Sequence, residues 1–280
     1  MLRIVVLGSA AGGGVPQWNC GCPVCRAARG DQPELRSTQC SIAISGDGDH
    51  WFLINASPDL RQQLVAARQL HPKAGQLRHS PIAGVILTNG EVDAVAGLLS
   101  MREGSPFTIH AHPTVLAILK ANSIFNVLSE ANVKRVAIAI EEPFEPRLPD
   151  GTGSGIEILP FAVPGKVAWY LRDKSLPGGR GDELGDTLGL RIRDKKTDKY
   201  VVFLAACAHV TDELKARLVL PDLPAEGSYH TLAGLVLALL RRVPRVGDRI
   251  VFSGWRFEVL EMDGRRVDKV LASREPSVEA

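Results

Sequence analysis

LGSAAGGGVPQWNCGCPVCRAAR, residues 7–29, follows a short apolar run and joins a glycine-rich turn to three closely spaced cysteines. Cys20, Cys22 and Cys25 lie within six positions, although the whole chain has 5 cysteines. Thiolates bind Zn²⁺ tightly, and a structural zinc site is tetrahedral with four ligands. The C-x-C-x-x-C spacing therefore predicts three ligands of a structural zinc site. Three unligated thiols in a surface loop are the alternative interpretation.

The fourth zinc ligand lies outside this motif. Cys40, His209 or a carboxylate are candidates, and the sequence does not choose among them. Because metal binding and folding are coupled in such clusters, removal of the metal is expected to unfold the segment locally.

Three consecutive glycines, Gly12, Gly13 and Gly14, precede the cysteines and invite comparison with a phosphate-binding loop. The dinucleotide fingerprint must open a helix so that backbone N–H groups point at the phosphates. Here Pro16 and the cysteine segment follow instead. The pattern favours a turn in which the backbone passes close to a neighbour or to a site.

Composition places the chain among folded proteins of ordinary charge. Its 280 residues are 45% hydrophobic and carry a formal net charge of +2, which gives no argument for a nucleic-acid or anionic-membrane partner. Five cysteines in a chain of this length do not make a disulfide framework, so a reducing compartment fits better. The apolar runs at 2–7 and 232–240 are too short for a signal peptide or a membrane span. We expect a soluble cytoplasmic protein.

Strand-like runs outnumber helical ones and do not alternate with them strictly. Strands are predicted at 3–7, 40–45, 51–57, 83–88, 107–111, 133–140, 156–163, 166–172, 187–194 and 199–206. Helices are predicted at 58–70, 93–103, 113–129, 210–218 and 231–243, and a short strand meander at 248–254, 255–262 and 266–273. This pattern is typical of an α/β protein of the α+β kind, with sheets packed face to face and helices outside.

Five stretches taken in order resemble one known family. They are residues 7–29, LINASPDLRQQL at 53–64, GVILTNGEVDAVAGLLSMREG at 84–104, VPGKVAWYL at 163–171 and FLAACAHVTDELKARL at 203–218. Over residues 1–218 the chain resembles the coenzyme PQQ synthesis protein B family of the metallo-β-lactamase superfamily. The resemblance implies a four-layer αββα sandwich, a structural zinc on the cysteine segment, and a role in making pyrroloquinoline quinone (PQQ). PQQ is a redox cofactor built from a Glu and a Tyr of a small precursor peptide.

The superfamily's metal motif, H-x-H-x-D-H, corresponds here to Asn89, Glu91, Asp93 and Ala94. Three of the four positions lack histidine, so the resemblance does not support a binuclear hydrolase. Glu91 and Asp93 remain oxygen ligands that suit a hard cation. His209 is the remaining imidazole candidate, with a histidine simply hydrogen-bonded at a strand end as the alternative. The resemblance thus implies Glu91, Asp93 and His209 as catalytic candidates and ligands of a second metal, for which iron is the hypothesis.

After about residue 218 the chain departs from this family. Residues 219–273 resemble part of the CorC/HlyC transporter-associated domain, through YHTLAGLVLALLRRVPRVGD at 229–248 and WRFEVLEMDGRRVDKV at 255–270, and residues 274–280 form a tail. The last strands of the sandwich are replaced, so we expect a C-terminally truncated sandwich with an unpaired sheet edge, followed by a small α+β module.

Three functional hypotheses follow. The first is metal-dependent oxidation or hydroxylation of the tyrosine-derived part of the PQQ precursor. The second is a non-catalytic carrier that takes part in transport of PQQ or its precursor to the periplasm. The third is a fusion whose C-terminal module binds an adenine-nucleotide-type ligand. A homodimer is a further hypothesis that the resemblance leaves open.

A second histidine pattern stands apart from these hypotheses. His110 and His112 are two positions apart in HAHP, which places both side chains on one face of a strand. Such a pair can bind metal, but no third partner is evident, and the pattern favours a surface strand.

Overall fold

The structure is a computed structural model. It describes residues 1–165, 167–171, 185–207, 211–219, 239–240, 242–252, 254–263 and 266–274. The chain divides into two compact units, Met1–Ala208 and His209–Ala280. The sequence interpretation placed the corresponding boundary after residue 218.

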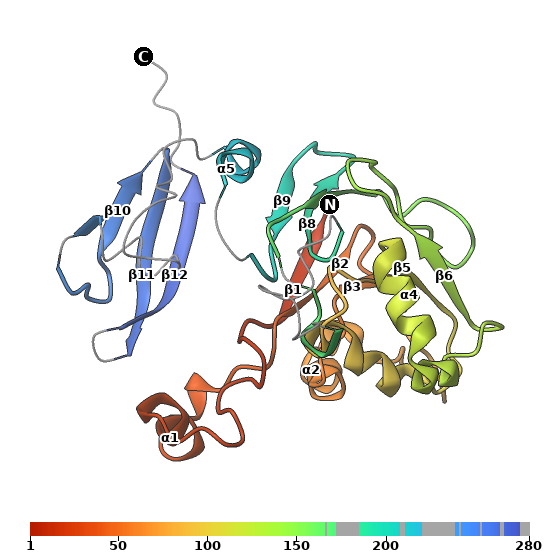
Figure 1. The fold of residues 1–280 in the computed structure, drawn as a ribbon, viewed down its shortest axis with the longest axis horizontal. Helices are drawn as coiled ribbons and strands as arrows, with labels where there is room; N and C mark the ends of the chain where they lie inside the picture. Colours follow the sequence, from red (N-terminus) through yellow and green to blue (C-terminus); the bar gives the residue numbers. More distant parts are fainter. Residues whose placement is uncertain are drawn as a thin grey trace. The chain divides into compact units, whose positions relative to one another are not determined.

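The first unit is built on a six-stranded sheet in the order β1-β2-β3-β4-β5-β6 (Figure 1). The strands are β1 (Arg3–Gly8), β2 (Ser41–Ser45), β3 (Trp51–Ile54), β4 (Ile82–Ile86), β5 (Phe107–Ala111) and β6 (Val133–Ala137). The first three strands pair antiparallel, and β3 to β6 run parallel. Strands β2, β3 and β4 are buried along their whole lengths, which explains their nearly continuous apolar runs.

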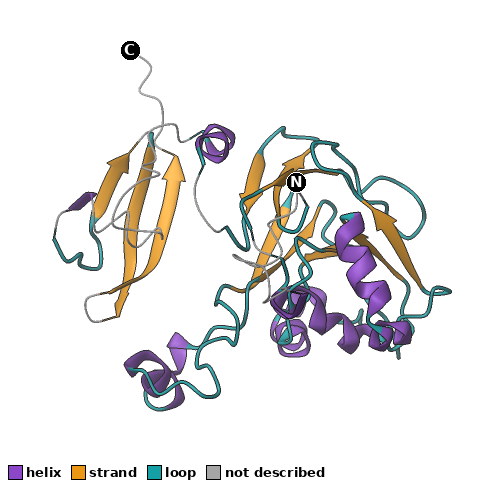
Figure 2. Cartoon of the chain, in the orientation of Figure 1, coloured by secondary structure: helices purple, strands orange, loops and turns teal. Residues whose placement is uncertain are grey.

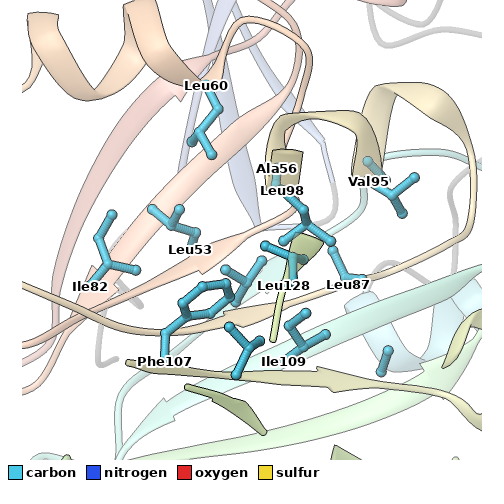
Figure 3. Close-up of a cluster of buried hydrophobic side chains, with 14 of the residues drawn as sticks. Leu53, Ala56, Leu60, Ile82, Leu87, Val95, Leu98, Phe107, Ile109 and Leu128 are labelled. Atoms are coloured by element: carbon cyan, nitrogen blue, oxygen red, sulfur yellow. The ribbon is translucent and has the colours of Figure 1, made fainter. Parts of the chain in front are cut away.

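Helices cover one face of this sheet. They are α2 (Leu60–Ala66), η2 (Arg68–Leu70), α3 (Val92–Val95), η3 (Ala96–Met101), α4 (Pro113–Ala121) and η4 (Ser123–Val127). Their apolar side chains pack on alternate residues of the strands, as Figure 3 shows for Leu60, Leu98 and Leu128 beside Leu53 and Ile109. This cluster is the larger of the two cores in the first unit.

A second, antiparallel sheet lies against the other face of the first. It consists of β7 (Ile156–Ala162), β8 (Leu188–Asp194) and β9 (Tyr200–Phe203), in that order. Apolar residues of β7 and β8 pack on those of β2, β3 and β4 to form the core between the sheets. In the described residues, helices, six-stranded sheet and three-stranded sheet thus form three successive layers (Figure 2). These are three of the four layers of the αββα sandwich that the resemblance implies, and the described residues do not include the outer helical layer.

Among the described residues each sheet has two edge strands, β1 and β6 in the first sheet and β7 and β9 in the second. Large apolar side chains are exposed on β1 and β9: Val6 is 67% exposed and Tyr200 is 44% exposed. Because every open sheet ends in edge strands, the expected truncation of the sandwich stays a prediction.

The second unit has a small core of its own. Helix α5 (Asp212–Leu218) begins with Thr211, whose hydroxyl accepts a hydrogen bond from the backbone N–H of Leu214. Strands β10 (Arg249–Phe252), β11 (Trp255–Asp263) and β12 (Arg266–Arg274) form an antiparallel meander as predicted. The predicted helix at 231–243 lies largely outside the described residues.

Two local predictions are wrong. Residues 166–172, expected as a strand, contain the 3-10 helix η5 (Trp169–Leu171). His110 is not on a surface strand, because β5 lies inside the sheet and the side chain is 6% exposed.

No helix in the described part of the chain combines the length and apolar composition needed to cross a membrane.

Candidate functional site

Cys20, Cys22 and Cys25 converge as the sequence predicts. Their Sγ atoms all lie within 4.8 Å of one another. The segment leaves the end of β1 and continues into helix α1 (Pro23–Arg29), which Figure 1 shows apart from the sheets. Cys22 is the N-cap of α1, and its Sγ accepts a hydrogen bond from the backbone N–H of Cys25 at 3.5 Å. The cluster is therefore formed by a helix start as well as by a loop.

The donor set of this cluster fits zinc. The backbone N–H of Cys25 and the side chain of Cys20 lower the pKa of the Cys22 thiol, which favours the thiolate that a metal binds. In a tetrahedral site with Zn–S bonds of about 2.3 Å, neighbouring sulfurs lie ~3.8 Å apart, a small adjustment from the observed spacing. Arg29 donates a hydrogen bond to the carbonyl of Cys20 at 2.6 Å, which ties α1 back onto the cysteine turn.

The predicted candidates for a fourth zinc ligand do not join the cluster in the described structure. Cys40 directly precedes β2, and its backbone N–H donates to the carbonyl of Ala10 at 2.9 Å. Burial raises the pKa of the Cys40 thiol. His209 lies outside the described residues. Within the residues that the structure describes, the metal-ligand group contains the three cysteines alone.

A second constellation follows β4, at the position of the superfamily's metal motif. Asn89 pairs with Thr187, the residue before β8, in an isolated bridge. The side-chain oxygen of Asn89 accepts from the backbone N–H of Glu91 at 3.0 Å. Glu91 is the N-cap of α3, and Asp93 lies in the first turn of that helix. The loop is thus folded so that both carboxylates belong to one short helix start.

The glycine turn lies directly beside Asp93. A Cβ atom added to Gly12 would stand 2.5 Å from Oδ2 of Asp93, so the absence of a side chain there makes room for this carboxylate. The sequence interpretation of the glycines, as a turn that passes close to a neighbour or to a site, agrees with this geometry. Burial and the neighbouring charge of Asp59 raise the pKa of Asp93.

Asp59 is a member of this site that sequence reasoning missed. Its Oδ2 accepts from the backbone N–H of Gln39 at 2.9 Å and from the Gln39 side chain at 3.1 Å. Gln39 in turn accepts from the backbone N–H of Gly13 at 3.2 Å, so one buried amide links the carboxylate to the glycine turn. The sequence feature that could have revealed Asp59 is the SPDL stretch at 57–60, in which an Asp immediately precedes the helix α2.

A small cleft lies on the Asp59 side of the glycine turn. Its volume is about 190 Å³. The lining residues are Gly13, Gly14, Val15, Pro16, Arg36, Ser37, Thr38, Asp59 and Gln62. The cleft is polar, and it combines the carboxylate of Asp59 with the guanidinium-bearing Arg36.

On the other side, Tyr170 borders the loop after β4. Its hydroxyl donates to the carbonyl of Gly90 at 2.6 Å, and burial together with the charge of Glu91 raises the pKa of Tyr170. Tyr170 was not assigned to the site from sequence, because residues 90 and 170 come together only through the fold. His112 caps α4, and burial lowers its pKa against the opposing effect of Asp186.

The described residues of this constellation do not supply three ligand atoms close enough to share one metal ion. Glu91 and Asp93 are present, whereas Ala94 offers no ligand and His209 lies outside the described residues. The carboxylates of Glu91 and Asp93 can bind a cation or an amine. The phenol of Tyr170 can contact a polar group of a ligand.

The fold and this loop define a class of protein. The sequence model of the Beta-lactamase superfamily domain matches residues 50–224, which contain the loop after β4 and the three strands of the second sheet. The chain is thus a protein of the metallo-β-lactamase fold.

Closer relatives define the family. A Coenzyme PQQ synthesis protein B of Bradyrhizobium diazoefficiens is 72% identical over 218 residues, which are 78% of this chain and 70% of that protein. One from Methylorubrum extorquens strain PA1 is 45% identical over 265 residues, or 94% of this chain and 82% of that protein. The crystal structure of Zn(2+)-bound PqqB from Methylobacterium extorquens has a TM-score of 0.70 and 49% identity, covering 78% of this chain and 69% of the other. The chain belongs to the coenzyme PQQ synthesis protein B family.

A different family model matches the C-terminal part. It is described as Transporter associated domain and covers residues 203–276, so that it overlaps the β-lactamase match at residues 203–224.

Proposed function

We propose that this protein takes part in the biosynthesis of pyrroloquinoline quinone. The observation that carries the proposal is the 72% identity to a Coenzyme PQQ synthesis protein B over 218 residues, a range long enough to include the cysteine cluster and the carboxylate site. The substrate or cargo is then PQQ or a precursor derived from a small peptide.

Cys20, Cys22 and Cys25 would hold a structural zinc ion. Support comes from their convergent sulfurs and from a relative that is a Zn(2+)-bound protein. Because α1 begins at the cluster, the metal would fix the orientation of this helix and of the turn that leads to it.

The finer proposal is that the carboxylate site assists oxidation or hydroxylation of the tyrosine-derived ring. Glu91, Asp93 and His209 are the candidate ligands of a second metal, iron. The described residues offer two carboxylates rather than three ligands, so an iron site needs His209 or a substrate group in addition. Bound iron would supply the one-electron chemistry of ring oxidation. Tyr170 and Asp59 would orient the substrate from either side of the carboxylates.

A carrier of PQQ or its precursor is the second candidate. It is favoured by the replacement of all three motif histidines, which leaves Asn89, Glu91 and Ala94 at those positions. The same site would then bind a ligand without changing it.

Iron(II) titration of the zinc-loaded protein under anaerobic conditions, followed by titration with PQQ, separates these candidates. Enzyme chemistry predicts one iron site per chain that Asp93→Asn weakens at least tenfold. The carrier role predicts PQQ binding with no iron dependence. Neither iron nor PQQ binding would contradict both candidates. Asp31→Asn, on the exposed segment after α1, is the matched control.

Three further hypotheses stay predictions. They are adenine-nucleotide binding by residues 219–273, transport to the periplasm by a cytoplasmic protein, and a homodimer. Equilibrium dialysis against ATP and AMP tests the first, and no binding by the full chain would contradict it.

A further inference from the structure

A second, larger pocket lies in the first unit between the β5–β6 edge of the six-stranded sheet and the segment of residues 142–151. Its volume is about 590 Å³, which falls in the range of small-molecule sites. Apolar side chains from both sides line it, among them Phe107, Val136, Phe144 and Leu148. Lys134 and Arg147 also line it, and both are exposed.

The pocket is separate from the carboxylate site. Its lining comes mostly from strands β5 and β6 and from the segment of residues 142–151, and it includes neither Glu91 nor Asp93. Asp59 and Tyr170 are not among the lining residues either, so the two sites share no side chain.

His110 is the unusual residue in this lining. Its side chain is 6% exposed, and neither Nδ1 nor Nε2 has a hydrogen-bond partner in the described protein. Burial lowers the pKa of His110 to about 4, so that the ring is neutral at physiological pH and offers one N–H donor and one acceptor nitrogen. Buried polar atoms in native proteins are nearly always paired, so an unpaired imidazole in a pocket calls for a partner.

The ring is held in a defined orientation. Phe144 stacks on it with ring centroids 5.3 Å apart and an interplanar angle of 27°. Phe144 covers one face of the imidazole, and both ring nitrogens are buried, so a ligand that pairs with them has to enter deeply enough to reach this edge. Phe107, Val136 and Leu148 form the apolar part of the lining, which suits a flat apolar body.

We propose that this pocket binds a small aromatic molecule whose hydroxyl group is hydrogen-bonded to His110. A phenolic O–H donates to the acceptor nitrogen, and its ring packs between Phe107, Val136 and Leu148. A ligand without a hydroxyl or another polar group would leave the imidazole nitrogens unpaired.

The test uses the full zinc-loaded chain with p-cresol as the probe and toluene as the matched probe without a hydroxyl. NMR of the ¹⁵N-labelled histidine side chains follows the His110 nitrogens directly. We expect p-cresol to shift them at saturation and to bind at least fivefold more tightly than toluene. Unmoved His110 signals, or equal affinity for both probes, would show that water alone occupies the polar edge and would overturn the proposal.

A variant pair sharpens the result. His110→Phe keeps a stacking ring against Phe144 and removes the nitrogens, so it should weaken p-cresol binding at least fivefold and leave toluene binding within twofold. His79→Phe, at a half-buried histidine outside the pocket lining, should change neither affinity. An equal loss for both probes in His110→Phe would contradict the hydrogen bond. The wild-type comparison still decides the proposal if this variant does not fold.

Discussion

Gly12 shows how one residue of the glycine turn shapes the site. Its missing side chain leaves space that Oδ2 of Asp93 occupies. Burial, and after it the nearby charge of Asp59, raises the pKa of that carboxylate. Two like charges near each other are unfavourable unless a cation or a ligand joins them. The turn therefore belongs to the functional site and not only to the chain's path from β1 to the cysteines.

Gly12→Ala is expected to reduce PQQ production at least tenfold. The added Cβ would displace the Asp93 carboxylate, which ends a flexible side chain, so the midpoint of thermal unfolding should move by less than a few degrees. Gly21→Ala is the control, since a Cβ there meets nothing within 4 Å. Production measured by chromatography of culture extracts checks this. Equal production by the two variants would show that the position of the Asp93 carboxylate does not matter.

Cys22→Ala is expected to lower the zinc content from about one per chain to less than ~0.1, because two thiolates hold zinc far more weakly than three. Hydrogen exchange in α1 should quicken, since the helix begins at the cluster. Cys40→Ala serves as the control and should keep its zinc. Metal analysis by mass spectrometry gives the answer, and a variant that retained its zinc would refute the ligand assignment.

At the scale of elements, the close approach of η3 to the β3–α2 connection depends on Gly97. Its backbone N–H donates to the carbonyl of Ala56 at 2.8 Å, and an added Cβ would stand 2.1 Å from the carbonyl oxygen of Ser57. This contact positions the helix that carries Asp93, because α3 runs directly into η3.

Gly97→Ala should lower the free energy of unfolding by about 1–3 kcal/mol, the usual cost of overpacking against backbone. Ser100→Ala, on the exposed side of the same helix, should change it by less than ~0.5 kcal/mol. Urea denaturation followed by circular dichroism measures both. A neutral Gly97→Ala would mean that η3 shifts freely, contrary to the tight packing described.

Asp194 joins the two sheets near the start of the chain. The backbone N–H groups of Leu2 and Lys196 donate to its carboxylate at 2.7 and 2.8 Å. These bonds lower the pKa of Asp194 to about 2. Because the folded-state pKa is depressed from an ordinary value near ~3.9, the stabilisation is complete above about pH 4 and is lost as the pH falls through 2.

Asp194→Asn should therefore be less stable than the wild type at pH 5, and the difference should shrink steadily between pH 4 and pH 2. Denaturant titrations at a series of pH values test this. Asp198→Asn, an exposed residue in the turn after β8, is the control. A difference between wild type and Asp194→Asn that stayed constant with pH would show that the carboxylate's charge does not join the sheets.

The strands of the first unit could be predicted from sequence because buried β-branched runs such as IAGVI in β4 have few alternatives. Residues 166–172 have similar composition but end in a 3-10 helix, where the hydroxyl of Tyr170 bonds to the carbonyl of Gly90, 80 positions earlier. A contact between residues so far apart in the chain produces no pattern in the sequence around residue 170. The burial of His110 was missed for a related reason: alternation along a strand does not reveal whether the strand is central or at an edge.

At the scale of the whole molecule, two families meet in one chain. The β-lactamase and transporter-associated matches overlap at residues 203–224, and each compact unit has a hydrophobic core of its own. The cysteine cluster and the glycine turn, the two sequence features most typical of the family, both lie in the first unit.

The sites could be predicted from sequence only in part, and the carboxylate site only through the resemblance. The motif alignment pointed to Glu91 and Asp93, and the spacing of cysteines pointed to the zinc cluster. Asp59 and Tyr170 carry no motif of their own and reach the site through α2 and η5. His209, the candidate that would complete a metal site, lies outside the described residues.

The central claim is a role in PQQ biosynthesis that depends on the carboxylate site. Its most direct test is PQQ production by a bacterial strain that lacks its own coenzyme PQQ synthesis protein B and carries this chain instead. We predict that the wild-type chain and Asp31→Asn restore PQQ in the medium, whereas Asp93→Asn restores less than about a tenth of it. No restoration by the wild-type chain, or full restoration by Asp93→Asn, would contradict the account.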